Sequence, residues 1–139
     1  MIRMIKILGI TTLLTLPLTI SAAPPPEGAS TRIISPADGD TVSSPVTVVF
    51  GLTGLGVAPA GTDKENTGHH HLLVDVEELP PAGEPIPSDD HHRHFGGGQT
   101  EASLDLAPGE HTLQLIFGDK NHTPHTPPVM SEKITITVE

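Results

Sequence analysis

Apolar and polar residues alternate along much of the chain after residue 31, which is the period-two pattern of strands that bury one face. Gly, Pro, Asp and Asn residues separate the alternating stretches as turns do, and no stretch carries an apolar stripe at helical spacing. Residues 32–35 predict a first strand. The core faces predicted for the later strands are Val46, Val48, Phe50 and Leu52; Leu72, Val74 and Val76; Leu104 and Leu106; Leu113, Leu115 and Phe117; and Ile134, Ile136 and Val138.

Short strands at this spacing are typical of two packed sheets. We therefore predict an all-β fold, an antiparallel immunoglobulin-like β-sandwich of about seven strands over residues 32–139, with no helix of three turns or more after residue 40. One domain fits this length. A flexible Pro-rich lead-in is expected at residues 24–31, before the first strand.

The first 23 residues have the composition of an export signal. Arg3 and Lys6 precede an apolar run over residues 7–20, and small residues follow at 21–23. The run is shorter than the roughly 20 residues that a membrane-spanning helix needs. We expect a signal peptide over residues 1–23, a periplasmic or secreted bacterial protein, and no membrane span once the signal is removed.

Charge and cysteine content narrow the choice of partners. Removal of residues 1–23 takes away two cations and moves the formal net charge from −10 to −12, which disfavours nucleic acid as a partner and favours cations. The chain has no Cys, so neither disulfides nor thiolate metal sites can form. The usual hydrolase motifs G-x-S-x-G and H-E-x-x-H are also missing from the sequence.

Histidine is the unusual feature of the composition. All nine lie between His69 and His125, with dense groups at residues 69–71 and 91–94. Two long connections, residues 53–68 and the acidic, Pro-rich residues 77–90, lead into these groups, and long connections of this kind are usually functional or mobile. Because several imidazoles near one point can bind Zn or Cu, the grouping favours a metal site.

Strand geometry sorts these side chains. Residues i and i+2 share a strand face about 6 to 7 Å apart, close enough for two imidazoles to bind one ion. His69 and His71 then form one pair on the face opposite to the core, His92 and His94 form a second, and His122 and His125 offer a third within a loop. Asp75 follows His71 on the same face. We predict these seven residues as metal ligands, with Asp89, Asp90 and Asp119 as further ligands or hydrogen-bond acceptors.

Two histidines are better explained as structural. His70 shares the inward face of its strand, and His111 precedes an inward-facing strand after a turn, where a ring can hydrogen-bond to the backbone. Residues 96–98, three consecutive glycines, lack the Lys-Ser/Thr of a phosphate-binding loop and predict instead a tight bend or close approach beside His94.

Several blocks of the chain resemble a family of small exported bacterial domains of unknown function. They are residues 34–39 (ISPADG), 66–75 (NTGHHHLLVD), 94–101 (HFGGGQTE), 108–115 (PGEHTLQL), 118–122 (GDKNH) and 127–131 (PPVMS). The resemblance covers nearly all of the chain after the signal, and its HHHLL and HFGGGQT blocks are specific. It implies bacterial export and a compact β-rich domain, and it implies no activity.

Three hypotheses for function follow. The first is a module without catalytic activity that binds a divalent transition metal, copper or zinc, through neutral imidazoles. The second is an adhesion or scaffold domain of the cell envelope, whose histidines are structural and whose partner is an envelope protein or a glycan. The third is a metal-dependent enzyme, because His69, His71 and Asp75 are similar to the two-histidine-one-carboxylate arrangement of cupins.

The metal hypothesis makes three structural and chemical predictions. His92 or His94 should lie near His69 and His71 although some 20 residues separate the two groups. Metal affinity should fall between pH 7 and pH 5, because a protonated imidazole cannot bind a metal. Replacement of His69 and His71 should barely change the protein without metal, because both side chains are expected to face away from the core.

Overall fold

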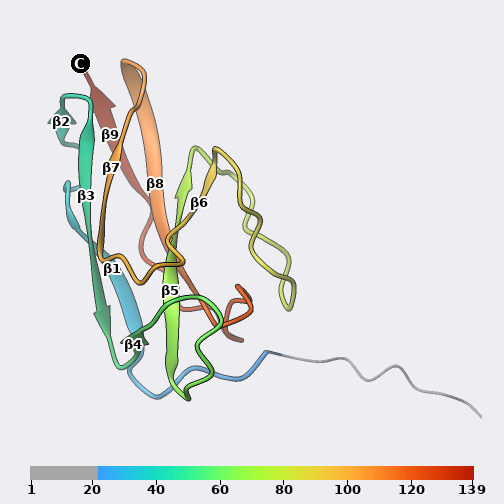
Figure 1. Ribbon diagram of the computed structural model, residues 1–139. Coiled ribbons are helices and arrows are strands. Elements are labelled where there is room, and N and C mark those ends of the chain that lie inside the picture. The colour runs from blue at the N-terminus through green and yellow to red at the C-terminus, as the bar shows by residue number, and fades with distance from the viewer. Residues whose placement is uncertain (1–21) are drawn as a thin grey trace, which may run out of the picture.

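Two β-sheets face each other in this protein (Figure 1). The computed structural model describes residues 22–139, so the predicted signal peptide, apart from Ala22 and Ala23, lies outside the described residues. Those residues contain nine strands and no helix, which confirms the all-β prediction. The strands are β1 (Ser30–Ser35), β2 (Thr41–Val42), β3 (Val46–Thr53), β4 (Gly56–Val57), β5 (Thr67–Val74), β6 (His92–His94), β7 (Glu101–Leu104), β8 (Gly109–Gly118) and β9 (Ile134–Val138).

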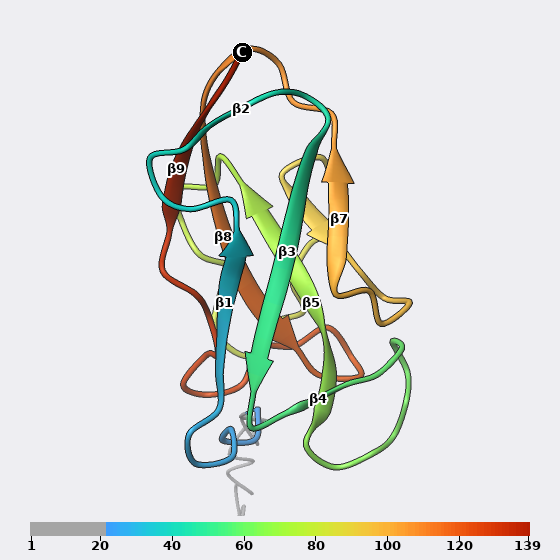
Figure 2. The ribbon, with the colours of Figure 1, turned by 90° about the vertical axis from the view of Figure 1, so that its left-hand side faces the viewer.

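The smaller sheet has the order β1-β3-β7, and the larger has the order β2-β9-β8-β5-β4, with β6 also paired to β5 (Figure 2). The long pairs are antiparallel, as predicted. The two-residue strands β2 and β4 instead pair in parallel with β9 and β5, so the larger sheet is mixed. These two strands were not predicted, because two residues are too few to show alternation.

The main core fills the space between the sheets. β3 contributes Val46, Val48 and Phe50, all nearly inaccessible to solvent, while Leu52 is only partly buried. The remaining members of this core come from β5, β7, β8 and β9: Leu72, Val74, Leu104, Leu113, Leu115, Ile136 and Val138. The alternation in the sequence therefore predicted the inward face of each long strand.

The outer face of β5 is also covered, which the sequence did not predict. Leu73 of β5 and Ile116 of the neighbouring β8 lie on this outer face of the larger sheet and pack with Ile86 of the Pro-rich loop over residues 75–91. Met130, from the loop that follows β8, completes this second apolar cluster. Figure 1 shows both loops on the side of the larger sheet that faces away from β1 and β3.

One predicted core residue lies in this second cluster instead of the first. Val76 was assigned to the inward face with Leu72 and Val74, yet it packs against the outer cluster. β5 ends at Val74, and Asp75 has a positive φ of 56°, so the alternation stops there. A strand pattern extended past such a residue places every later side chain on the wrong face.

The lead-in joins the sandwich earlier than predicted, because Ser30 and Thr31 belong to β1. The buried Thr31 hydroxyl donates a hydrogen bond to the Gly51 carbonyl oxygen.

Within residues 22–139, no helix has the length and apolar character needed to cross a membrane.

Candidate metal centre

Four imidazole rings gather on the outer face of β5. His69 and His71 come from β5 itself, and the antiparallel register places His94 of β6 directly opposite His71. On the other edge of β5, His69 lies opposite Gly118, the last residue of β8. The chain turns back after Gly118 and brings His122 to the same point. Three segments far apart in the sequence thus contribute to one cluster.

The rings are close enough to share an ion. The centroid of His69 lies 4.8 Å from that of His71, 5.0 Å from that of His94 and 5.0 Å from that of His122. One ring nitrogen from each of His69, His71 and His94 lies within 4.8 Å of the others. The predicted convergence of the two histidine groups is therefore confirmed. In a zinc site each of these nitrogens would lie roughly 2.0 to 2.1 Å from the ion.

Burial distinguishes this cluster from a surface patch. His69 and His71 lie on the face of β5 opposite to the main core, as predicted, and both are nevertheless 0% exposed. Within the described part of the chain, neither nitrogen of either ring has a hydrogen-bond partner, and the same is true of Nε2 of His94. A buried polar group without a partner costs about 1 to 3 kcal/mol, so this arrangement is unfavourable unless the nitrogens bind something.

The electrostatics of the cluster favour neutral imidazole. Burial, reinforced by the charges that neighbouring histidines would carry, lowers the pKa of His69 to about 4 and that of His71 to about 3. The nearby Asp119 carboxylate acts against this shift at His69. The pKa of His94 is also lowered, first by burial and then by His122. Both β5 rings therefore stay neutral, the form that binds metals, at a lower pH than an ordinary histidine.

Two glycines make room for the rings. A Cβ atom at Gly96 would overlap Cε1 and Nε2 of His94, so only glycine leaves that ring in place. This confirms the predicted close approach beside His94. A Cβ atom at Gly118 would lie 3.0 Å from Nε2 of His71 and 3.3 Å from the His122 backbone. The role of Gly118 was not predicted, because the approach of His122 depends on a turn that alternation does not reveal.

The loop that carries His122 is fixed at several points. Oδ1 of Asp119 accepts hydrogen bonds from the N–H groups of Asn121 and Thr123, and the His122 N–H donates to the Asp119 carbonyl oxygen. The His122 carbonyl oxygen accepts a hydrogen bond from the N–H of Ile86, which joins this loop to the Pro-rich loop. His122 has a positive φ of 67°.

The structure does not bring the other three predicted ligands into the cluster. Asp75 lies past the far end of β5, where its carboxylate accepts hydrogen bonds from His111 and from the Thr112 N–H. His92 shares the face of His94, but its Nδ1 lies 2.8 Å from the Asp89 carboxylate. His125 stacks on Phe117, with 6.5 Å between the ring centroids. The i, i+2 spacing gave the correct strand face for the pairs on β5 and β6. It did not show that β5 ends before Asp75, and it does not apply to His122 and His125, which lie in a loop.

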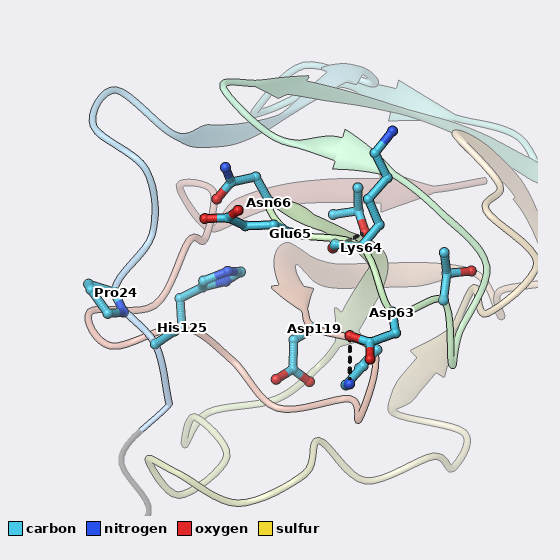
Figure 3. Close-up of a pocket in the computed structure, with 11 residues that line it drawn as sticks. Pro24, Asp63, Lys64, Glu65, Asn66, Asp119 and His125 are labelled. Carbon is cyan, nitrogen blue, oxygen red and sulfur yellow. Dashed lines mark hydrogen bonds and ion pairs between the residues drawn. The ribbon is translucent and has the colours of Figure 1, made fainter.

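His125 lines a separate pocket of about 510 Å³, open to solvent, which Figure 3 shows. Asp119 lies on the wall of the same pocket, and the carboxylate of Asp63 there forms an ion pair of 2.7 Å with Lys120. Nδ1 of His125 is buried without a partner in the described residues, and burial lowers its pKa. The pocket contains charges of both signs, and its lining includes one imidazole, so it does not form a second histidine cluster.

His111 is structural, as predicted, although its surroundings differ in part from those expected. Its Nε2 lies 2.8 Å from the Ala107 carbonyl oxygen, which is the expected backbone bond, and its Nδ1 lies 2.8 Å from Oδ2 of Asp75. Both partners are acceptors, so the ring satisfies both only as the imidazolium. The hydrogen bond to Asp75, followed by that to Ala107, raises the pKa of His111. The ring is partly buried at the edge of the sandwich.

We expect His111→Ala to lower the free energy of unfolding by about 1 to 3 kcal/mol at pH 6 and by less at pH 9. A raised folded-state pKa means that the stabilisation is complete below the unfolded-state value of about 6.5 and is lost as pH rises through the folded-state pKa. Urea unfolding of the metal-free protein at both pH values measures the difference. Asp75→Asn should reduce the same pH dependence. An equal effect of His111→Ala at both pH values would contradict the ion pair.

Comparison with known protein families shows which family the chain belongs to. The family model described as a domain of unknown function, DUF4399, matches residues 48–139, which include every histidine of the cluster. The chain belongs to this family. Searches of curated proteins and of solved structures found no match. The family description names no activity, so the function must be argued from the cluster.

Proposed function

We propose that this protein is an exported module that binds a divalent transition metal, copper or zinc, through the imidazoles of His69, His71 and His94, and that it has no catalytic activity. The observation that supports the proposal is the convergence of three ring nitrogens within 4.8 Å. Two of the rings are fully buried, and none of their nitrogens has a hydrogen-bond partner among the described residues. Bound metal would satisfy one nitrogen of each ring.

The surroundings of the cluster agree with this function. Buried neutral imidazole is a ligand suited to Zn, Cu and Ni ions, and Gly96 and Gly118 leave space for the rings. The nearby Asp119 carboxylate would offset part of the positive charge that a divalent ion brings to a buried position. The cupin-like enzyme is less well supported, because Asp75 is hydrogen-bonded to His111 and Thr112 at the other end of β5.

We expect addition of Zn(II) or Cu(II) to raise the melting temperature of the metal-free protein at pH 7.5, because an ion that binds only the folded state stabilises it. The gain is about 2.7 kcal/mol when the free ion exceeds its Kd a hundredfold. Differential scanning calorimetry of protein purified without a histidine tag measures the shift. Elemental analysis of the same protein, recovered from its native compartment, tests whether a metal is bound there.

The matched variants for this experiment are His94→Ala and His92→Ala. Both residues lie on β6 and share one face, but only His94 joins the cluster. His94→Ala should abolish most of the metal-dependent shift, whereas His92→Ala should leave it intact. Gly96→Ala should act like His94→Ala, because the added methyl group displaces the His94 ring. Equal shifts in the wild-type protein and His94→Ala would contradict the proposed site and would favour the envelope-scaffold hypothesis.

We propose that the protein acts in the periplasm or outside the cell. The support is the sequence of residues 1–23, with two early cations, an apolar run and a small-residue end. Expression of the full chain in a Gram-negative host should give protein in the periplasmic fraction, and mass spectrometry should find its first residue near Ala22 or Ala23. Recovery of the uncleaved chain from the cytosol would contradict this location.

A further inference from the structure

We infer that His122 is the fourth ligand of the metal centre, so that the ion is enclosed by four imidazoles in tetrahedral geometry and keeps no position for a substrate. This inference rests on the proposed metal-binding function and specifies it. It selects ions that accept tetrahedral coordination, such as Zn(II) and Co(II), over the tetragonal arrangement that Cu(II) prefers.

The distances between the four rings support a tetrahedron. Metal–nitrogen bonds of about 2.0 to 2.1 Å in a tetrahedral site place the ring centroids about 5 Å apart. A square-planar site with the same bonds has four separations of about 4.5 Å and two, across the square, of about 6.4 Å. The distances observed are 4.7 Å for His94–His122, 4.8 Å for His69–His71, 5.0 Å for His69–His94 and for His69–His122, 5.1 Å for His71–His94 and 6.0 Å for His71–His122. Five of the six are near the tetrahedral value, and only the His71–His122 separation is long. The ring nitrogens of His69, His71 and His94 form the group within 4.8 Å, and His122 is not part of that group, so its ring has to turn toward the other three to bind the same ion.

The backbone holds His122 at this position. The hydrogen bonds that Asp119 accepts from the N–H groups of the following residues form the turn, and the bond from the Ile86 N–H to the His122 carbonyl oxygen fixes the residue between two loops. Gly118 lets the His122 backbone pass close to the His71 ring, since a side chain there would contact both. The ring of His122 thus lies over the other three as part of the folded loop.

A closed coordination sphere has a functional consequence. Catalytic zinc sites have three protein ligands and an open fourth position, whereas sites with four protein ligands are structural. With His122 bound, the centre joins β5, β6 and the loop after β8 through one ion. We therefore expect the metal to cross-link these elements or to be held as cargo, and not to activate a substrate.

Co(II) added to the full mature chain without an affinity tag is the probe, because tetrahedral Co(II) absorbs visible light far more strongly than six-coordinate Co(II). The wild-type complex should show the intense spectrum, and added azide should leave it unchanged because no position is open.

The matched variants are His122→Asn and His125→Asn, from the same loop. Asn suits the positive φ of His122 and is a poor ligand for these ions. His122→Asn should bind Co(II) at least tenfold more weakly and should respond to azide, whereas His125→Asn should behave as the wild type.

The outcomes separate this inference from the proposed function. A wild-type complex that binds Co(II) at His69, His71 and His94 but responds to azide would overturn the four-ligand site and leave the metal-binding function standing. Unchanged affinity and spectrum in His122→Asn would do the same. A wild-type protein that binds neither Co(II) nor Zn(II) would overturn both. The azide titration uses wild-type protein, so it decides the question even where a variant folds poorly.

Discussion

Gly68→Ala is expected to lower the free energy of unfolding by about 3 kcal/mol or more, because β5 and β8 leave no space for a side chain at this position. A Cβ atom there would overlap the Gly118 carbonyl oxygen and lie 2.7 Å from Cε1 of Phe117. The first neighbour is backbone and the second is a fully buried ring, so neither can move without disturbing the sheet. Gly68 also pairs with Val57 and precedes His69. Chemical denaturation of the metal-free protein measures the effect.

Gly97→Ala is the control for this substitution. The three atoms nearest to a Cβ atom at Gly97, at 3.1 to 3.4 Å, all belong to the side chain of Gln99. That exposed side chain can move, at the cost of the hydrogen bond that its Oε1 accepts from the Gly97 N–H. We expect a change in stability of less than about 1 kcal/mol.

Gly68→Ala should also weaken metal binding, because the separation of β5 from Gly118 sets the distance between His69 and the His122 loop. Wild-type stability in Gly68→Ala would show that β5 and β8 are not packed as closely as the structure indicates.

The sandwich could be predicted from the sequence because strand alternation is a local property. The long strands β3, β5 and β8 carry apolar residues at alternate positions over part of their length, such as Leu72 and Val74 of β5, and these residues form the core between the sheets. Because neighbouring side chains of a strand point to opposite faces, the sequence also separated His70 from His69 and His71. His70 lies between Phe50 and Phe117 in the core, and the other two lie on the opposite face. These assignments require no knowledge of which strands are neighbours.

The second layer over β5 could not be predicted in the same way. Ile86 is one apolar residue in a Pro-rich loop, and Met130 is one in another, so neither forms a pattern that shows burial. Their packing on Leu73 turns the strand face opposite to the main core into a second interior. This burial matters for function, because a buried imidazole pair and an exposed pair differ in pKa and in the cost of an unpaired nitrogen.

The residues of the metal centre could likewise be predicted where they lie on strands, but not where their position depends on a turn or loop. The H-x-H spacing gave the facing pair on β5, and the register between β5 and β6 then placed His94 beside it. The separation of His122 from His125 depends on the turn around Asp119, and the place of Asp75 depends on its positive φ. Sequence spacing alone therefore predicted the four clustered residues together with three that lie elsewhere.

His70→Met is expected to raise the stability of the metal-free protein at pH 7.5 by roughly 1 kcal/mol, because the native ring is a buried polar group whose nitrogens have no hydrogen-bond partner among the described residues. The ring is 1% exposed, and its centroid lies 5.1 Å from those of Phe50 and Phe117. Methionine is flexible enough to fill this space and makes favourable sulfur contacts with aromatic rings. His70→Gln, which leaves a polar group in the same place, should lower the stability.

The advantage of His70→Met should grow as the pH falls. Burial, followed by the charge that His69 would carry, lowers the pKa of His70 to about 4, whereas the unfolded chain titrates near 6.5. Below pH 6.5 the unfolded state therefore binds more protons, and the native state loses stability down to the folded-state pKa. One pKa unit corresponds to about 1.4 kcal/mol, so at pH 5 the native histidine costs about 2 kcal/mol more than at pH 7.5. Urea denaturation of the wild type and His70→Met at both pH values measures this difference. A stability difference that does not change with pH would mean that His70 is protonated equally in the folded and unfolded chains and that its surroundings are not the apolar core described above.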